Sequence, residues 1–186
     1  MEKLLLVGAG GLGRVVLEMV SNIYACAFLD DKSETFVDGT PIIGRINEME
    51  NLFPEYTHLL VTIGDNVLRE RLQKKAEAIG YAIPTIIHSS AYISPHSHIG
   101  SGCIILNNSV VQNNTICGHG CILNSGVELH HDSTLGDFCL IYTNSVVRSL
   151  ATVGKRVWIG STATVSTRAT VPDDTIIEDG AVFKAQ

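Results

Sequence analysis

Residues 93–129 read ISPHSHIGSGCIILNNSVVQNNTICGHGCILNSGVEL, with an apolar residue at every sixth position, and the phase continues to Phe183 without an insertion. These positions hold Ile93, Ile99, Ile105, Val111, Cys117, Leu123, Leu129, Leu135, Ile141, Val147, Val153, Ile159, Val165, Val171, Ile177 and Phe183. Small residues stand two places earlier, at Ala91, Ser97, Cys103, Ser109, Thr115, Cys121, Val127, Ser133, Cys139, Ser145, Ala151, Val157, Ala163, Ala169, Thr175 and Ala181. Because side chains alternate along a strand, both members of each pair point the same way.

Such a repeat predicts a parallel β-helix, in which three short strands and three turns close one triangular coil with the apolar residues inside. Asparagine tolerates left-handed backbone angles better than most residues and stands at turn positions. The turn asparagines are Asn107, Asn108, Asn113, Asn114, Asn124 and Asn144. Cys103, Cys117, Cys121 and Cys139 take inward positions and are expected to be core residues. The repeat by itself leaves the hand of the coil open.

Residues 1–87 follow a different pattern, in which strand-like and helix-like segments alternate. Predicted strands cover 3–7, 25–29 and 59–63, and predicted helices cover 12–22 and 66–79. Residues 81–87 form a fourth apolar run, and Asp38-Gly39-Thr40-Pro41 is typical of a turn. This alternation predicts a Rossmann-like α/β domain with a parallel sheet covered on both faces. The sequence thus divides into an α/β domain over 1–87 and a β-helix over 88–186.

The composition restricts the function classes. The 186 residues are 45% hydrophobic and 17% charged, which excludes a disordered chain. The net charge of −6 argues against nucleic acid and anionic membrane as partners. There is no apolar stretch long enough to span a membrane, and the apolar start is too short for a secretion signal, so we expect a cytoplasmic protein. The five cysteines lack the spacing of a disulfide framework or a zinc site.

A glycine-rich motif, Gly8-Ala9-Gly10-Gly11-Leu12-Gly13, lies between the first predicted strand and helix. Its spacing, G-x-G-x-x-G, lets backbone amides at a helix N-terminus approach a pyrophosphate. Asp30 or Asp31, after the second strand, suits ribose or base contacts. An NAD-dependent oxidoreductase is an alternative, although 87 residues are too few for a full dinucleotide fold with a substrate domain. A tight turn that serves only packing is another.

The repeats Ile-Gly-Ser-Gly-Cys-Ile and Leu-Gly-Asp-Phe-Cys-Leu resemble those of hexapeptide-repeat acyltransferases, which are trimeric left-handed β-helices that use acyl-coenzyme A. Four further segments resemble one branch, the sialic acid O-acetyltransferase family, which includes N-acetyltransferases of nucleotide-linked 4-amino sugars. These segments are Val7–Gly13, Phe28–Lys32, Ile63–Asn66 and Ile87–Ser94. The resemblance implies acetyl-coenzyme A-dependent transfer to the amine or hydroxyl of a nucleotide-linked sugar or sialic acid, in bacterial glycan biosynthesis.

The resemblance also implies a homotrimer with its active site between subunits and acetyl-coenzyme A as the acyl donor. No metal is expected, because the spacing of the histidines does not provide three that converge. It assigns the nucleotide-sugar pyrophosphate to Gly8, Gly10, Gly11 and Gly13. It places Asp30, Asp31, Lys32, Gly64 and Asp65 near the nucleoside.

The segment 124–138, NSGVELHHDSTLGDF, resembles the catalytic stretch of the family. On this resemblance His131 is the catalytic base, Asp132 its acidic neighbour and Asn124 a nearby substrate-binding residue. A neutral imidazole suits a base that takes the acceptor's proton near neutral pH. His130 is the alternative base, and a solvated surface histidine is the structural alternative. Acyl-coenzyme A binding falls to Ser149, Gly160 and Ser161, with Lys155, Arg156 and Arg168 as candidate cations for the coenzyme phosphates.

The sequence departs from the family pattern at three places, of which the first concerns nucleotide recognition and the other two favour an alternative function. Leu12 stands where the family often has histidine, and Leu140 replaces a histidine nine residues after the base. The family usually ends in a Gly-x-Pro-Ala-Lys segment, whereas this sequence stops at Gln186. The alternative is a non-catalytic trimeric paralogue that binds a nucleotide sugar or serves as a scaffold for a partner enzyme.

Overall fold

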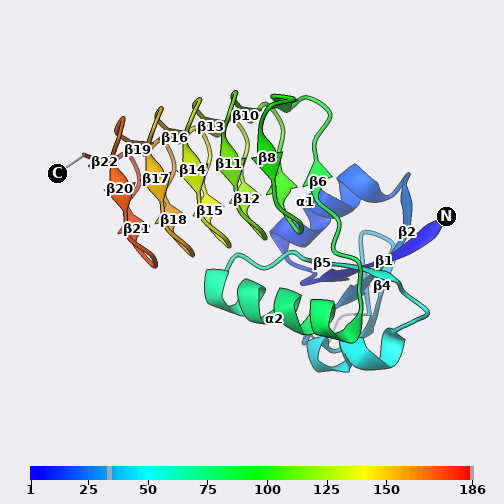
Figure 1. The fold of residues 1–186 in the computed structure, drawn as a ribbon. Coiled ribbons are helices and arrows are strands. Elements are labelled where there is room, and N and C mark those ends of the chain that lie inside the picture. The colour runs from blue at the N-terminus through cyan, green and yellow to red at the C-terminus, as the bar shows by residue number, and fades with distance from the viewer. Residues whose placement is uncertain (33–34, 185–186) are drawn as a thin grey trace. The chain divides into compact units, whose positions relative to one another are not determined.

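The computed structural model describes residues 1–32 and 35–184. The chain divides into two compact units, Met1–Ile86 and Ile87–Gln186 (Figure 1). Within the described residues, every helix is too short or too polar to cross a membrane.

The first unit is built on a mostly parallel sheet with strand order β3-β4-β2-β1-β5. The strands are β1 (Glu2–Val7), β2 (Tyr24–Leu29), β3 (Phe36–Val37), β4 (Thr40–Gly44) and β5 (His58–Val61). The helices are α1 (Gly11–Val20), the 3₁₀ helix η1 (Ile46–Leu52) and α2 (Asn66–Ile79). β1 pairs in parallel with β2 on one side and β5 on the other, and its residues Leu4, Leu5, Leu6 and Val7 are fully buried. A continuous apolar run is what such a doubly flanked strand requires.

The expected strands and helices of this unit are present, and three elements, β3, β4 and η1, were missed. Residues Asp38 and Gly39 turn with positive φ of 47° and 77°, as expected, but they join an antiparallel hairpin of β3 and β4. β4 begins at Thr40-Pro41, and these two residues were assigned to the turn because proline is common in turns. η1 has apolar residues at helical spacing, Ile46, Met49 and Leu52, and sequence reasoning missed this signal. The run 81–87 contributes only a bridge from Ala82 to His58 and the strand β6 (Ile86–Ile87), since Pro84 has no N–H to donate.

The second unit is a parallel β-helix whose coils stack along one axis (Figure 1). Each strand pairs in parallel with the strand eighteen residues further on, as Val110 does with Glu128. One sheet contains β7 (Tyr92–Ile93), β10 (Val110–Val111), β13 (Glu128–Leu129), β16 (Val146–Val147), β19 (Thr164–Val165) and β22 (Val182–Phe183). The second contains β8 (His98–Ile99), β11 (Ile116–Cys117), β14 (Thr134–Leu135), β17 (Thr152–Val153) and β20 (Thr170–Val171). The third contains β6, β9 (Ile104–Ile105), β12 (Ile122–Leu123), β15 (Leu140–Ile141), β18 (Trp158–Ile159) and β21 (Ile176–Ile177).

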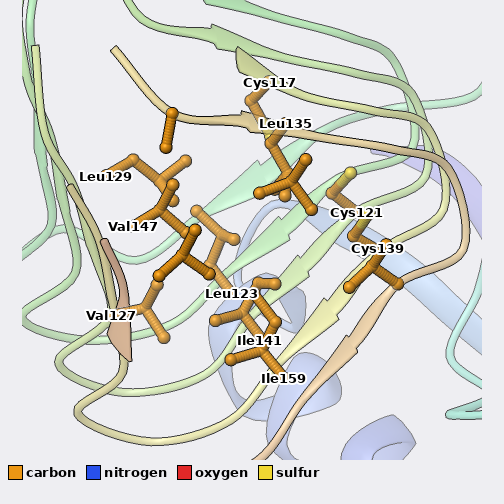
Figure 2. Close-up of a cluster of buried hydrophobic side chains, with 14 of the residues drawn as sticks. Cys117, Cys121, Leu123, Val127, Leu129, Leu135, Cys139, Ile141, Val147 and Ile159 are labelled. Atoms are coloured by element: carbon orange, nitrogen blue, oxygen red, sulfur yellow. The ribbon is translucent and has the colours of Figure 1, made fainter. Parts of the chain in front are cut away.

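The inward positions are those that the sixfold spacing predicted. Figure 2 shows side chains such as Leu123, Leu129, Ile141 and Val147 meeting inside the coil, and only the terminal coils leave inward residues partly exposed. The small residues have a second role, because their hydroxyl or thiol groups donate to a carbonyl fifteen residues ahead. These bonds run from Ser109 Oγ to Asn124 O (3.0 Å), Cys121 Sγ to Gly136 O (3.1 Å) and Thr115 Oγ1 to His130 O (2.9 Å). Cys103, Cys117, Cys121 and Cys139 are therefore core residues, as expected.

From Gly102 to Gly180, each turn of the coil contains one residue in the left-handed region, again at sixfold spacing. Asn108, Asn114 and Asn144 have φ of 58°, 56° and 59°, which confirms their expected conformation. The other turn asparagines, Asn107, Asn113 and Asn124, do not have positive φ, so that part of the expectation was wrong. A turn has two central residues, and only the second is left-handed here.

Replacing Val147 with aspartate should unfold the coil, because this side chain is 1% exposed inside it. The loss of apolar burial and the burial of a carboxyl without a partner should together cost about 3 kcal/mol or more. Thr152→Asp is the matched control, since Thr152 points outward on β17 and is exposed. Thermal melting followed by circular dichroism should fall sharply for the first variant only. Equal melting of Val147→Asp and the wild type would contradict the inward assignment.

Candidate active site

A hydrogen-bonded chain of side chains runs across three coils at the corner between β13 and β14. Residues eighteen apart stack on neighbouring coils, which brings Ser149 to His131 and Asn114 to Asp132. Asn114 Nδ2 donates to Asp132 Oδ1 at 2.6 Å, and Asp132 Oδ2 lies 2.7 Å from His131 Nδ1. Ser149 Oγ lies 2.9 Å from His131 Nε2. The coil thus assembles an Asn-Asp-His-Ser constellation.

The carboxylate of Asp132 decides which nitrogen of His131 carries the proton. Hydrogen bonds from Asn114 and from His131 lower the pKa of Asp132, so the carboxylate is charged near neutral pH. An ionised carboxylate only accepts, so the proton lies on Nδ1 and the lone pair on Nε2. The side chain of His131 is 55% exposed, and its basic nitrogen is bonded to Ser149 Oγ.

The structure separates the two histidines that sequence reasoning left as alternatives. His130 is 28% exposed, and its Nε2 lies 3.2 Å from Glu128 Oε2, on the outer side of β13. It therefore lies outside the chain formed by Asn114, Asp132, His131 and Ser149. This geometry favours His131 as the candidate base.

The turns also leave backbone N–H groups open, because the first central residue of each turn donates to no backbone carbonyl. Several of these amides are satisfied by side chains, as when His131 N donates to Gln112 Oε1 at 3.0 Å. Lys155 N and Ser161 N likewise donate to Asp173 and Asp179. Among the described residues, Ser149 N–H has no acceptor. A donor therefore lies next to the basic nitrogen of His131.

The remaining residues proposed for this unit lie at another corner. Asn124 lies between β12 and β13, and its Nδ2 donates to Ile141 O at 3.0 Å. Gly160 and Ser161 lie between β18 and β19, so they share that corner and not the corner of His131. Ser161 was predicted to bind acyl-coenzyme A. Its N–H donates to Asp179 Oδ1 at 2.6 Å. Of the residues predicted to bind acyl-coenzyme A, the structure thus joins Ser149 to His131, and Gly160 and Ser161 lie elsewhere.

Two of the three candidate cations for coenzyme phosphates are already paired. Lys155 Nζ lies 2.9 Å from Asp137 Oδ2, and Arg156 makes two bonds of 2.7 Å to Asp174. Arg168 is exposed, and its backbone N donates to Ser149 O at 3.3 Å. Arg168 therefore lies one coil beyond Ser149 at the corner of His131.

In the first unit, the glycine-rich motif lines a cavity of about 440 Å³. Its lining comprises Ala9, Gly10, Gly11, Arg14, Lys32, Phe36, Val37 and Asp38. Gly8 has φ of 105°, and a Cβ on Gly13 would lie 2.1 Å from Gly8 O, so neither position accommodates a side chain. At Gly10 and Gly11 an added Cβ would meet nothing within 4 Å, so their backbone faces open space.

The other residues predicted to bind the nucleoside have distinct positions. Asp30 accepts from Ala9 N at 2.7 Å and from Lys32 N at 2.9 Å, so its carboxylate holds two loops together. Asp31 accepts from Ile46 N and lines a separate cavity beside α2. Asp65 is the N-cap of α2 and accepts from Leu68 N.

Gly64, next to Asp65, has its carbonyl bonded by Arg69 Nη1 at 3.2 Å. Among these nucleoside residues, only Lys32 lines the glycine-loop cavity.

Sequence reasoning missed four lining residues of that cavity, Arg14, Phe36, Val37 and Asp38. Arg14 Nε and Nη2 bond the two carboxylate oxygens of Asp38 at 2.8 and 3.2 Å. Phe36 is 64% exposed, which is unusual for a phenylalanine that only packs. The position of Arg14 in the first turn of a helix after a glycine motif is a signal that could have identified it.

Three inward thiols, those of Cys103, Cys117 and Cys121, lie within 4.8 Å of one another. Hydrogen bonds to Cys103 and Cys121, together with burial, raise the pKa of the Cys117 thiol well above its usual value. Cys103 and Cys121 each donate to a backbone carbonyl, as the serines at equivalent positions do. The three side chains thus pack in the coil interior as the other inward residues do.

Comparison with known proteins places these features in context. The family model described as the PglD N-terminal domain matches residues 3–76. The chain is 34% identical over 116 residues to UDP-N-acetylbacillosamine N-acetyltransferase of Bacillus subtilis, a match over 57% of this chain and 52% of that protein. The match thus spans about half the length of this curated relative.

Solved structures extend the similarity over the whole chain. A mutant of perosamine N-acetyltransferase from Caulobacter crescentus, in complex with CoA and GDP-perosamine, has a TM-score of 0.94 at 28% identity, covering 100% of this chain and 92% of that one. The acetyltransferase domain of PglB from Neisseria gonorrhoeae has a TM-score of 0.75 at 30% identity, covering 99% and 97%. The architecture is thus a Rossmann-like domain followed by a left-handed parallel β-helix.

Removing the amide of Asn114 should raise the pKa of Asp132, because that hydrogen bond is the largest cause of its lowering. Asn114→Gly is the suitable change, since glycine accepts the φ of 56° at this position. A carboxyl with a lowered pKa stabilises the fold at neutral pH and loses this contribution as the pH falls through its folded pKa. The variant should therefore lose less stability on acidification. Carbon-13 NMR titration of Asp132 tests the shift, with Asn108→Gly as control; an unchanged pKa would contradict the geometry.

Gly13→Ala should destabilise the first unit, because the new methyl group would overlap with Gly8 O. Overpacking of this kind costs about 2 kcal/mol. Gly11→Ala is the matched control, since its methyl group meets nothing within 4 Å. Thermal melting should fall for the first variant and stay unchanged for the second. Identical melting of both variants would show that the glycine loop is looser than described.

Proposed function

Because the chain belongs to the family of hexapeptide-repeat sugar acyltransferases that includes N-acetyltransferases of nucleotide-linked 4-amino sugars, we propose that it acetylates the amine of such a sugar, with acetyl-coenzyme A as donor. The observation that carries this proposal is the constellation of Asp132, His131 and Ser149 at one corner of the coil. It combines an imidazole with a fixed tautomer, a hydroxyl on its basic nitrogen and an adjacent open amide.

The chemistry of acyl transfer fits these groups. The acceptor amine attacks the thioester carbonyl, and its proton passes to His131 Nε2. Asp132 keeps Nδ1 protonated and stabilises the imidazolium that forms. Ser149 N–H can donate to the oxygen that becomes negative in the tetrahedral intermediate. The imidazolium then protonates the departing thiolate, which leaves as coenzyme A and returns His131 to its neutral form.

The first unit supports recognition of a nucleotide. The open backbone at Gly10 and Gly11, the N-terminus of α1 and the Lys32 side chain present positive partial and full charge to one cavity. These groups suit a pyrophosphate on a chain whose net charge is −6. The exposed ring of Phe36 offers a surface against which a base can stack. The remaining predicted nucleoside residues, Asp31 and Asp65, belong to loops at the same edge of the sheet.

Two further features complete the proposal. The protein acts as a homotrimer, with the acetylation site at a boundary between subunits, as the family resemblance implied. Acetyl-coenzyme A and nucleotide sugars are cytoplasmic metabolites, so the reaction takes place in the cytoplasm.

His131→Ala should reduce turnover by about 10²- to 10⁴-fold, the usual contribution of a general base. The assay is release of coenzyme A thiol from acetyl-coenzyme A, with GDP-perosamine and UDP-linked 4-amino sugars as acceptors. His130→Ala is the control and should retain turnover, because His130 faces Glu128 instead. Both variants should melt as the wild type does. Full turnover in His131→Ala would transfer the role to another residue.

A thermal shift experiment separates the alternative functions, because a ligand that binds the folded state raises its melting temperature. Stabilisation by both acetyl-coenzyme A and a nucleotide sugar, with thiol release, supports the acetyltransferase. Stabilisation by the nucleotide sugar without thiol release from any acceptor would make the chain a non-catalytic binding protein. Stabilisation by NAD would instead support the oxidoreductase.

A further inference from the structure

The hydroxyl group of Ser149 covers the basic nitrogen of His131. Its Oγ lies 2.9 Å from Nε2, and Nε2 carries the lone pair because Asp132 holds the proton on Nδ1. The hydroxyl must therefore be the donor in this bond. Within residues 1–32 and 35–184 it has no second hydrogen-bond partner, so the lone pairs of Oγ remain open. A proton transferred to Nε2 along this hydrogen bond therefore comes from the Ser149 hydroxyl.

We propose that Ser149 is a further catalytic residue, whose hydroxyl passes the proton of the attacking acceptor to His131. This inference rests on the proposed acetyltransferase function and adds a group to its reaction. It goes beyond the assignment of Ser149 to acyl-coenzyme A binding.

In this relay two protons move together, and no atom is gained or lost. As the acceptor nitrogen forms its bond to the thioester carbon, its N–H proton moves to Ser149 Oγ, while the Oγ–H proton moves to His131 Nε2. Ser149 remains a neutral hydroxyl throughout, and His131 becomes an imidazolium. When the carbon–sulfur bond breaks, the Nε2 proton goes to the thiolate. The products are the amide and coenzyme A, and both protein groups return to their starting forms.

The stacking of the coils makes this relay geometrically direct. Ser149 supplies both its N–H, which is open, and its Oγ, which is bonded to the base. A thioester oxygen held by the N–H brings the carbonyl carbon to the same residue whose hydroxyl faces Nε2. The acceptor nitrogen attacking that carbon is then within reach of Oγ. Contact between the acceptor and Nε2 itself would require the serine side chain to rotate away and lose its hydrogen bond.

The chain contains a matched pair that serves as a control. Ser101 Oγ lies 3.0 Å from His119 Nδ1, and the two residues are also eighteen apart in sequence. Here Ser101 N–H donates to the same nitrogen at 3.1 Å, so the pair is a closed structural contact. Ser101→Ala therefore removes a serine–histidine bond of the same type from a different corner.

The test measures single-turnover acetyl transfer by rapid quench, with acetyl-coenzyme A and whichever of GDP-perosamine or a UDP-linked 4-amino sugar the wild type accepts. Ser149→Ala should slow this step about tenfold or more, within the range of general acid–base effects. Ser149→Thr should stay within about twofold of the wild type, because it keeps the hydroxyl and Thr167 shows that threonine fits the next coil at this corner. Ser101→Ala should match the wild type.

A proton inventory distinguishes a relay from a merely structural role. In mixtures of light and heavy water, the wild-type rate should fall along a curve, because two protons move together. The Ser149→Ala rate should fall along a straight line, because one proton moves. Straight lines for both proteins, an unchanged rate in Ser149→Ala, or an acetylated Ser149 in the quenched wild type would each overturn the relay.

A measurement without substrate separates failure of this inference from failure of the proposed function. Diethyl pyrocarbonate modifies a histidine through its free lone pair, and mass spectrometry of the His131 peptide gives the rate. Ser149→Ala should speed this modification severalfold, and Ser101→Ala should leave it unchanged. An inactive wild type that still shows this difference would refute the acetyltransferase and leave the serine–histidine contact standing. Equal modification rates would refute the contact itself and with it the relay.

Discussion

The repeated left-handed residue at every sixth position is the constraint on which the second unit depends. It occurs from Gly102 to Gly180 and turns each short strand into the next sheet. A residue with a Cβ costs about 1–2 kcal/mol in this conformation, yet Phe138 and Leu150 adopt it. Their N–H groups donate to the carbonyls of His119 and His131 on the preceding coil, which links each turn to its neighbour. Strain in one turn is thus offset by a bond between turns.

The hydrogen bonding of the turns both links the coils and leaves the N–H groups from which the proposed active site is built. In turns such as the one at His131, the first central carbonyl accepts a bond from the next coil, whereas the N–H of that residue has no backbone partner. At some turns a side chain from an adjacent coil fills the gap, as Asp137 does for His119 and Asp179 does for Ser161. Ser149 N–H has no such acceptor and lies in the residue bonded to His131. The proposed oxyanion donor is therefore an ordinary turn amide without a side-chain acceptor.

The sixfold spacing was enough to predict which side chains fill the interior of the coil, because every inward residue has the same environment. The turns were predictable only in part, since the spacing does not say which of two central residues is left-handed. Asn108 and Asn107 show the two outcomes within one turn. In the first unit, β4 was missed because a proline such as Pro41 is common in turns. The structural role of Asp30 was missed because the sequence does not show which N–H groups its carboxylate bonds, here those of Ala9 and Lys32.

The contact between His131 and Ser149 could have been predicted, because adding one coil of eighteen residues to His131 leads to Ser149. What the sequence could not supply is the direction of the side chains, which depends on the hydrogen bonds each corner makes. Leu140, on β15, shows why proton transfer depends on the corner of His131. It lies in an outward apolar ladder between Ile122 and Trp158 and is 4% exposed, so it can neither donate nor accept a proton. Where the family often has a second histidine, this chain has a hydrocarbon, and proton transfer must rely on groups stacked directly on His131.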